Sequence, residues 1–110
     1  MKYEPGAHQL VLCTCPDRGV AKHLAEMLLV RQLAACVNVI PGLESLYYWE
    51  GALQCDAECL LLIKTDQNCY SELEALLLEQ HSYDVPEIIA LPITHGSSTY
   101  LQWLDSCLKK

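Results

Sequence analysis

Residues 34–51 read AACVNVIPGLESLYYWEG, and this stretch decides how the rest of the chain is arranged. In extended form, residues 35–49 span about 50 Å at roughly 3.3 Å per residue, whereas a usual strand spans about 17–20 Å. Pro41 and Gly42 interrupt the stretch. Because proline cannot donate a ladder hydrogen bond, we expect a bulge or bend there and not an end.

Beyond this bend both faces of the expected strand carry bulk: Leu43, Tyr47 and Trp49 on one, Leu46 and Tyr48 on the other. A two-stranded ribbon alone is only marginally stable in water. The rest of a 110-residue chain is needed for its own core. The stretch therefore predicts a partner chain that covers it.

Composition limits the class of protein. The length of 110 residues predicts a single domain spanning 1–110. A formal net charge of −7 argues against binding to nucleic acid and to anionic membrane surfaces. The seven scattered cysteines, an odd number, indicate reduced thiols in a cytoplasmic protein rather than a disulfide framework. No apolar run approaches the ~20 residues of a membrane span, and none resembles a signal peptide.

The first half of the chain shows clear boundary signals. A buried strand is expected at 9–13, and Asp17 is a good N-cap for a helix that continues to about residue 33. After the long strand, Glu50 and Gly51 are expected to form a hairpin turn. The return strand at 52–65 is almost fully apolar, as is typical of a central strand.

The second half predicts three more elements. Asn68 is expected to cap a helix that runs to about residue 81. Two prolines in the strand predicted at 86–93 place it at a sheet edge. A last helix follows residue 97, with Leu101, Leu104 and Leu108 on one face.

The resulting order, β-α-β-β-α-β-α, predicts an α+β fold of the ferredoxin-like, split β-α-β type. Right-handed crossovers give an antiparallel sheet with strands in the order 4-1-3-2 and the first two helices on one face. Strands 2 and 3 form the long hairpin, and the C-terminal helix is an addition to the basic arrangement.

Several strings of the sequence resemble one known family. They are LCTCPD at 12–17, LAAC at 33–36, IPGLESLYYWEG at 40–51, LIKT at 62–65, HSYDVPEI at 81–88, LPITHG at 91–96 and YLQWL at 100–104. In this order they are specific, and the chain resembles the CutA divalent-cation tolerance proteins over nearly its whole length. The resemblance implies a cytoplasmic, non-catalytic homotrimer with interlocking hairpins that takes part in tolerance of divalent metal ions.

The resemblance also implies a copper site. Some family members use the cysteine of the LCT string and two consecutive histidines, which correspond here to Cys13, Gln80 and His81. The first histidine is thus replaced by Gln80, which leaves one thiolate and one imidazole. Copper is the expected ion, with other divalent metals bound weakly, and Cys15 and Gln80 are auxiliary candidates.

The element order alone predicts that Cys13 and His81 meet, since the first strand and the second helix both finish at the same end of the sheet. Cys15 shares a face with Cys13 if the strand continues. Soft thiolates suit Cu(I), and imidazole suits copper or zinc. The alternative is structural: Cys13 is a small buried hydrophobe and His81 a polar helix-ending group.

Other polar and aromatic residues have less specific roles. Tyr47, Trp49, Lys64 and Glu87 are candidates for a cleft between subunits, where Lys64 needs a partner because a buried charge is costly unless paired. The remaining thiols are expected to be packing or surface groups. His8, His23 and His95 are expected to be solvated or bonded locally.

Two further functions remain open. A trimeric module similar to the PII regulators would bind a nucleotide or small molecule at the subunit cleft, although the chain has no GxxxxGK[ST] motif. An enzyme would use Cys13 as nucleophile and His81 as base, but no third orienting group is visible. Both rank below a metal-linked binding protein.

Overall fold

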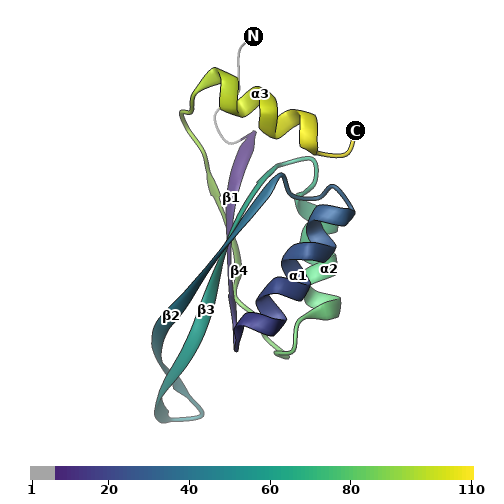
Figure 1. The fold of residues 1–110 in the computed structure, drawn as a ribbon. Helices are drawn as coiled ribbons and strands as arrows, with labels where there is room; N and C mark the ends of the chain where they lie inside the picture. The colour runs from purple at the N-terminus through teal and green to yellow at the C-terminus, as the bar shows by residue number, and fades with distance from the viewer. Residues whose placement is uncertain (1–6) are drawn as a thin grey trace.

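A computed structural model describes residues 7–110 of the chain, and its elements follow the expected order (Figure 1). They are β1 (His8–Cys15), α1 (Arg18–Val30), β2 (Cys36–Trp49), β3 (Ala52–Asp66), α2 (Tyr70–Gln80), β4 (Ile88–Pro92) and α3 (Ser98–Cys107). No helix in the described part is long and apolar enough to cross a membrane.

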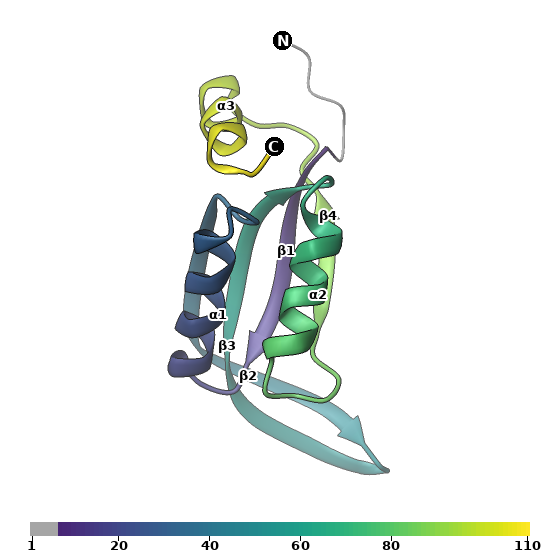
Figure 2. The same ribbon diagram turned by 90° about the vertical axis from the view of Figure 1, so that its right-hand side faces the viewer.

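The four strands form one antiparallel sheet in the order β2-β3-β1-β4. Helices α1 and α2 lie side by side on one face of this sheet (Figure 2). The predicted fold class and strand order are therefore confirmed, with β4 at one edge, as its prolines indicated.

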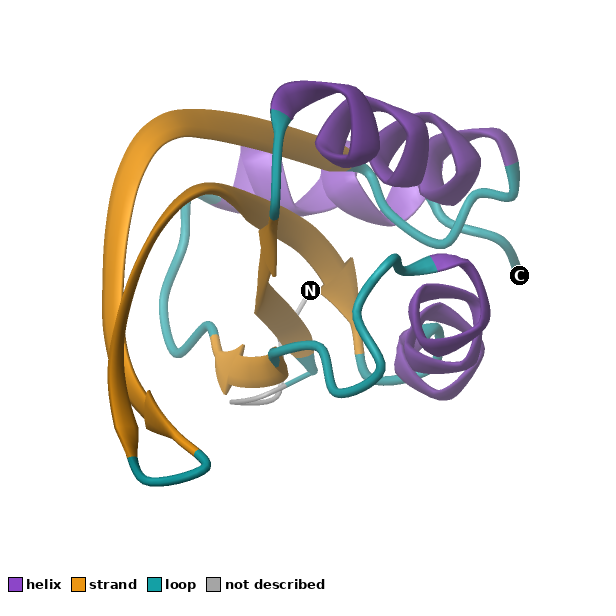
Figure 3. Ribbon diagram, turned by 90° about the horizontal axis from the view of Figure 1, so that it is seen from below, coloured by secondary structure: helices purple, strands orange, loops and turns teal. Residues whose placement is uncertain are grey.

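Strands β2 and β3 form the long hairpin, which curves away from the helices (Figure 3). Their register shifts between Ile40 and Leu43, as expected from the intervening Pro41 and Gly42. The tip is a two-residue turn in which Glu50 and Gly51 both have positive φ, 50° and 80°. This is the turn geometry that matches the right-handed twist of paired strands.

Of the two helix caps predicted from the sequence, one is confirmed and one is wrong, and α1 is shorter than expected. The Asp17 side chain caps α1 by accepting a hydrogen bond from the Val20 N–H at 2.8 Å. However, α1 ends at Val30 and not near residue 33, because Gln32 turns the chain with φ of 57°. The expected cap by Asn68 is wrong: Cys69 precedes α2, and its N–H donates to Asp66 Oδ1 at 2.9 Å.

The core lies between the sheet and α1 and α2. Alternate residues of the central strands β1 and β3 face the helices, because side chains alternate across a strand. Fully buried side chains from all four elements meet there: Val11, Cys13, Leu24, Leu28, Leu61, Ile63, Leu73 and Leu77. On the opposite face, Ile89 and Leu91 of β4 remain 49% and 44% exposed.

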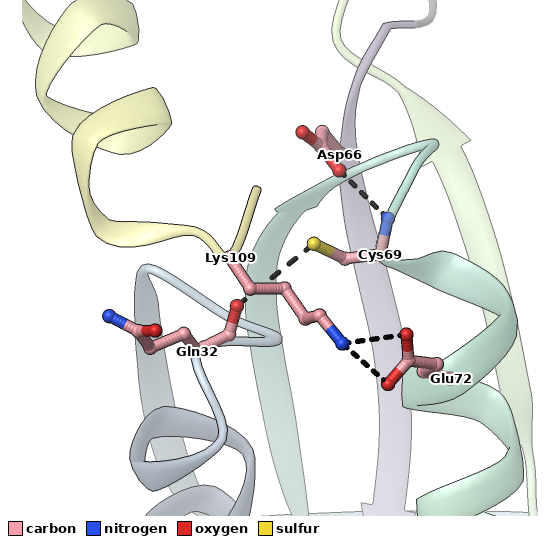
Figure 4. A network of polar contacts seen from close by, with 5 residues as sticks. All are labelled: Gln32, Asp66, Cys69, Glu72 and Lys109. Carbon is pink, nitrogen blue, oxygen red and sulfur yellow. Dashed lines mark hydrogen bonds and ion pairs between the residues drawn. The ribbon is translucent and has the colours of Figure 1, made fainter.

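The C-terminal segment closes the end of the sheet remote from the hairpin tip (Figure 1). Lys109 donates its backbone N–H to the Gln32 carbonyl at 2.9 Å. The Lys109 ammonium contacts Glu72 at 2.8 and 3.0 Å (Figure 4). His8, expected to be solvated or bonded locally, is buried, and its Nε2 lies 2.8 Å from Asp105 Oδ1 of α3.

Candidate functional site

The C-terminal ends of β1 and α2 lie together at the end of the sheet from which the hairpin extends (Figure 2). Cys13 and Cys15 occupy alternate positions of β1, and His81 directly follows α2. The sulfur atoms of Cys13 and Cys15 and one ring nitrogen of His81 all lie within 4.8 Å of one another. The structure thus brings the predicted residues Cys13, Cys15 and His81 into one cluster.

This cluster is closed to solvent. The side chains of Cys13 and Cys15 are fully buried, and His81 is 8% exposed. The two cysteines face the helices because β1 presents every second residue to the core. A group that binds here must therefore be small, and it must enter through local opening of the structure.

Both ring nitrogens of His81 are engaged. Nε2 lies 2.7 Å from the Thr14 carbonyl oxygen, and Nδ1 accepts the Tyr83 N–H at 3.0 Å. Because a carbonyl can only accept, Nε2 carries the proton and donates to it. The imidazole is therefore fixed in orientation between the strand and the loop that follows α2.

The two thiols influence each other. A hydrogen bond with Cys15 raises the pKa of the Cys13 thiol, and burial raises it further. The same hydrogen bond, with Cys13, lowers the pKa of Cys15. Cys15 is therefore the thiol of the pair that loses its proton more readily. A thiolate is the form of cysteine that binds a metal.

Two residues that were predicted for the site, Gln80 and Lys64, lie outside this cluster. Gln80 is exposed, and its amide donates to Glu79 Oε1 at 3.1 Å, so it is not part of the cluster. The Lys64 ammonium contacts Asn38 Oδ1 and lies 4.0 Å from Cys36 Sγ on the face opposite the helices. Within this one chain, Lys64 thus finds a polar partner away from Tyr47, Trp49 and Glu87.

Tyr47, Trp49 and Glu87 line a cleft of about 830 Å³ between the loop after α2 and residues 43–58, the part of the β2–β3 hairpin beyond the register shift, here called the outer hairpin. Its wall contains four carboxylates, Asp56, Glu58, Asp84 and Glu87, and no lysine or arginine from the described residues. Two of the carboxylates are bonded to tyrosines. Asp56 accepts from the Tyr47 hydroxyl, and Glu58 accepts from the Tyr83 hydroxyl at 2.7 Å.

Tyr83 joins the cleft to the cluster, because its N–H binds His81 and its hydroxyl binds Glu58. Burial and the hydrogen bond to Glu58 both raise the pKa of the Tyr83 hydroxyl. The sequence does not single out Tyr83 or Glu58. Glu58 is 8% exposed in β3, and its only signal in the sequence is its place directly before the apolar run Cys59–Ile63.

Comparison with known proteins supports a single family. The model of the family described as "CutA1 divalent ion tolerance protein" matches residues 9–107. The "Divalent-cation tolerance protein CutA" of Pectobacterium atrosepticum is 47% identical over 100 residues, which cover 91% of each chain. The "Protein CutA, chloroplastic" of Arabidopsis thaliana is 52% identical over 97 residues, covering 88% of this chain but 53% of that relative.

Solved structures agree with this assignment. CutA1 from Oryza sativa has a TM-score of 0.92 and 44% identity, covering 96% of this chain and 95% of its own. A protein described as the periplasmic divalent cation tolerance protein CutA, from Archaeoglobus fulgidus, has a TM-score of 0.90 and 33% identity, covering 93% and 99%. On sequence and fold together, this chain belongs to the CutA family of divalent-cation tolerance proteins.

Proposed function

We propose that this chain acts as a cytoplasmic homotrimer in the tolerance of divalent metal ions, and that it binds copper through Cys13 and His81 without catalysing a reaction. The observation that supports this most is the cluster itself, in which a thiol and an imidazole from distant segments have donor atoms within 4.8 Å. Thiolate and imidazole are ligands suited to copper.

The proposal of a trimer is supported by exposed apolar surface on the outer hairpin. Leu46, Tyr48 and Leu53 are 65%, 75% and 61% exposed, and Trp49 is 55% exposed. Contiguous exposed apolar patches usually mark a site of interaction. The three-fold symmetry comes from the family resemblance, and a second copy wrapping around each hairpin would bury these side chains.

A binding role is favoured over catalysis by the burial of the two candidate reactive groups. The Cys13 side chain has no exposed surface, and His81 is 8% exposed. A nucleophile and its base must both be reached by the substrate. A metal ion needs much less space than an organic substrate.

A second candidate function is small-molecule sensing at the cleft, since a volume of about 830 Å³ is large enough for a ligand. Its four carboxylates would repel nucleotide phosphates and favour a cationic molecule. Calorimetry with ATP, ADP and a polyamine would separate these classes. Micromolar binding of a nucleotide would favour the regulator-like function.

The test of the main proposal is metal analysis of untagged protein purified from its native cell, together with sedimentation. We expect copper in the trimer fraction of a cytosolic extract. Seven free cysteines are consistent with a reducing compartment. Recovery of the protein as a metal-free, stable monomer that does not take up added copper would refute the proposal.

A further inference from the structure

The copper proposal above uses one thiol, although a second lies in the same cluster. Cys15 is fully buried two positions after Cys13 on the same face of β1, and its sulfur belongs to the group of donor atoms within 4.8 Å. We propose that Cys15 is a third ligand and that the site holds Cu(I) between two thiolates and one imidazole. This inference rests on the proposed function.

The spacing of the three donor atoms is close to that in a three-coordinate metal site. Ligand atoms about 2.0–2.3 Å from a metal and 120° apart are separated from each other by about 3.5–4.0 Å. The three donors of the cluster lie within 4.8 Å of one another, so closing around an ion requires shifts of about 1 Å. Side-chain rotations are sufficient for shifts of this size.

The donor set selects a soft ion of low coordination number. Thiolates favour Cu(I), whereas structural zinc sites almost always have four ligands. No further His, Cys, Asp or Glu of residues 7–110 joins the three donors. Burial of both sulfurs limits the access of solvent water to the site. The cluster therefore fits Cu(I), which accepts two or three ligands, better than it fits a divalent ion.

The imidazole is already held as a ligand would be. Metal-bound histidines usually donate their other ring N–H to a carbonyl or carboxylate, which fixes the ring. His81 Nε2 donates to the Thr14 carbonyl at 2.7 Å. Coordination through Nδ1 would keep this bond and replace the one from the Tyr83 N–H. Since Thr14 lies between the two cysteines, strand and imidazole are positioned as one unit.

The proposal is tested by anaerobic competition of the reduced full-length protein against a Cu(I)-selective chelator. The variants are Cys13→Ser, Cys15→Ser and Cys15→Ala, and the control is Cys59→Ser. Cys59 is also buried and pairs with Cys15 across β1 and β3, but it is not part of the cluster. This control therefore removes a neighbouring thiol without removing a proposed ligand.

We expect Cys15→Ser and Cys15→Ala to weaken Cu(I) binding by about 100-fold or more, since loss of even an outer-shell partner costs 10–100-fold. Cys59→Ser should leave affinity within about threefold. X-ray absorption of the copper-loaded wild type should show two sulfur ligands per copper, which tests the proposal even if a variant folds poorly. One sulfur per copper in the wild type would overturn it.

The same titration separates the two proposals. If Cys13→Ser weakens binding and both Cys15 variants match the wild type, Cys15 is not a ligand and the proposed function stands. If the wild type binds no copper, the proposed function fails and the third ligand fails with it.

Discussion

The Nε2 atom of His81 lies 2.7 Å from the carbonyl oxygen of Thr14, so the end of α2 is bonded directly to the segment between the two clustered cysteines. This contact joins residues 67 positions apart in the sequence. It gives His81 a structural role whether or not a metal is present.

Replacing His81 with Ala should lower the free energy of unfolding by about 1–3 kcal/mol, because it leaves the Tyr83 N–H without its partner and the buried Thr14 carbonyl with only a weak bond from the Cys13 thiol. Urea denaturation would measure the change. Gln80→Ala is the control, since Gln80 is exposed and should change stability by less than about 0.5 kcal/mol. Equal effects of the two changes would contradict the assigned role of His81.

Gln80→His restores the histidine pair of the family pattern, yet we expect it to change copper affinity by less than about threefold. The side chain at 80 is exposed and bonded to Glu79, and in the proposed site Cys15 completes the set of donors. Competition against the same chelator measures this. A gain of tenfold or more, about 1.4 kcal/mol, would show that position 80 reaches the metal.

Trp49→Asp should dissociate the assembly, because a charge would be placed in an apolar interface with no partner. Trp49 is 55% exposed in one chain, near the end of the outer hairpin. Sedimentation velocity should show a shift to monomer and increased binding of an apolar dye. Glu44→Gln, a substitution at an exposed position of the same strand, should leave the assembly intact. Wild-type protein that sediments as a folded monomer at micromolar concentration would disprove the interface.

Cys69 should make the protein less stable at alkaline pH. Burial raises the pKa of its thiol from 9.0 to about 11 in the folded chain. The folded state thus favours the neutral thiol, and this contribution is complete below pH 9 and lost as the pH rises to about 11. Cys69→Ala should therefore reduce the loss of unfolding free energy between these values. An unchanged pH profile in chemical denaturation would contradict the assignment.

Asp105→Asn should loosen α3, because Asp105 accepts the hydrogen bond from buried His8 and so ties the helix to the first strand. A hydrogen bond to a charged group contributes about 1.5–3 kcal/mol, less where one partner is part-exposed. Amide hydrogen exchange in residues 98–107 should become faster. Asp84→Asn, an exposed change in the loop after α2, should have no effect on α3 exchange.

The sequence predicted those features of the fold that depend on neighbouring residues. Asp17 precedes an amphipathic helix, Pro41 and Gly42 interrupt a strand, and Glu50 and Gly51 separate two extended runs, so each signal is local. Asn68 failed as a cap because Asp66, two positions earlier, reaches the same helix end. Two acceptors in one loop cannot be ranked without the loop's conformation.

The candidate site was predictable only in part, for a different reason. Element order was enough to place Cys13 and His81 at one end of the sheet. The bonds from His81 to Thr14 and from Tyr83 to Glu58 depend on side-chain directions and on a backbone carbonyl, which no residue pattern encodes. The tie between His8 and Asp105 spans 97 positions and likewise required the packed structure.

The complete burial of the Cys13 and Cys15 sulfurs affects the rates at which an ion binds and dissociates rather than its affinity. An ion cannot exchange through a closed surface, so its arrival and departure must wait for the end of β1 or the loop after α2 to open. Local openings of this kind range from fraying of surface segments to nearly global unfolding. The residence time of a bound ion would then report how often the end of β1 or the loop after α2 opens.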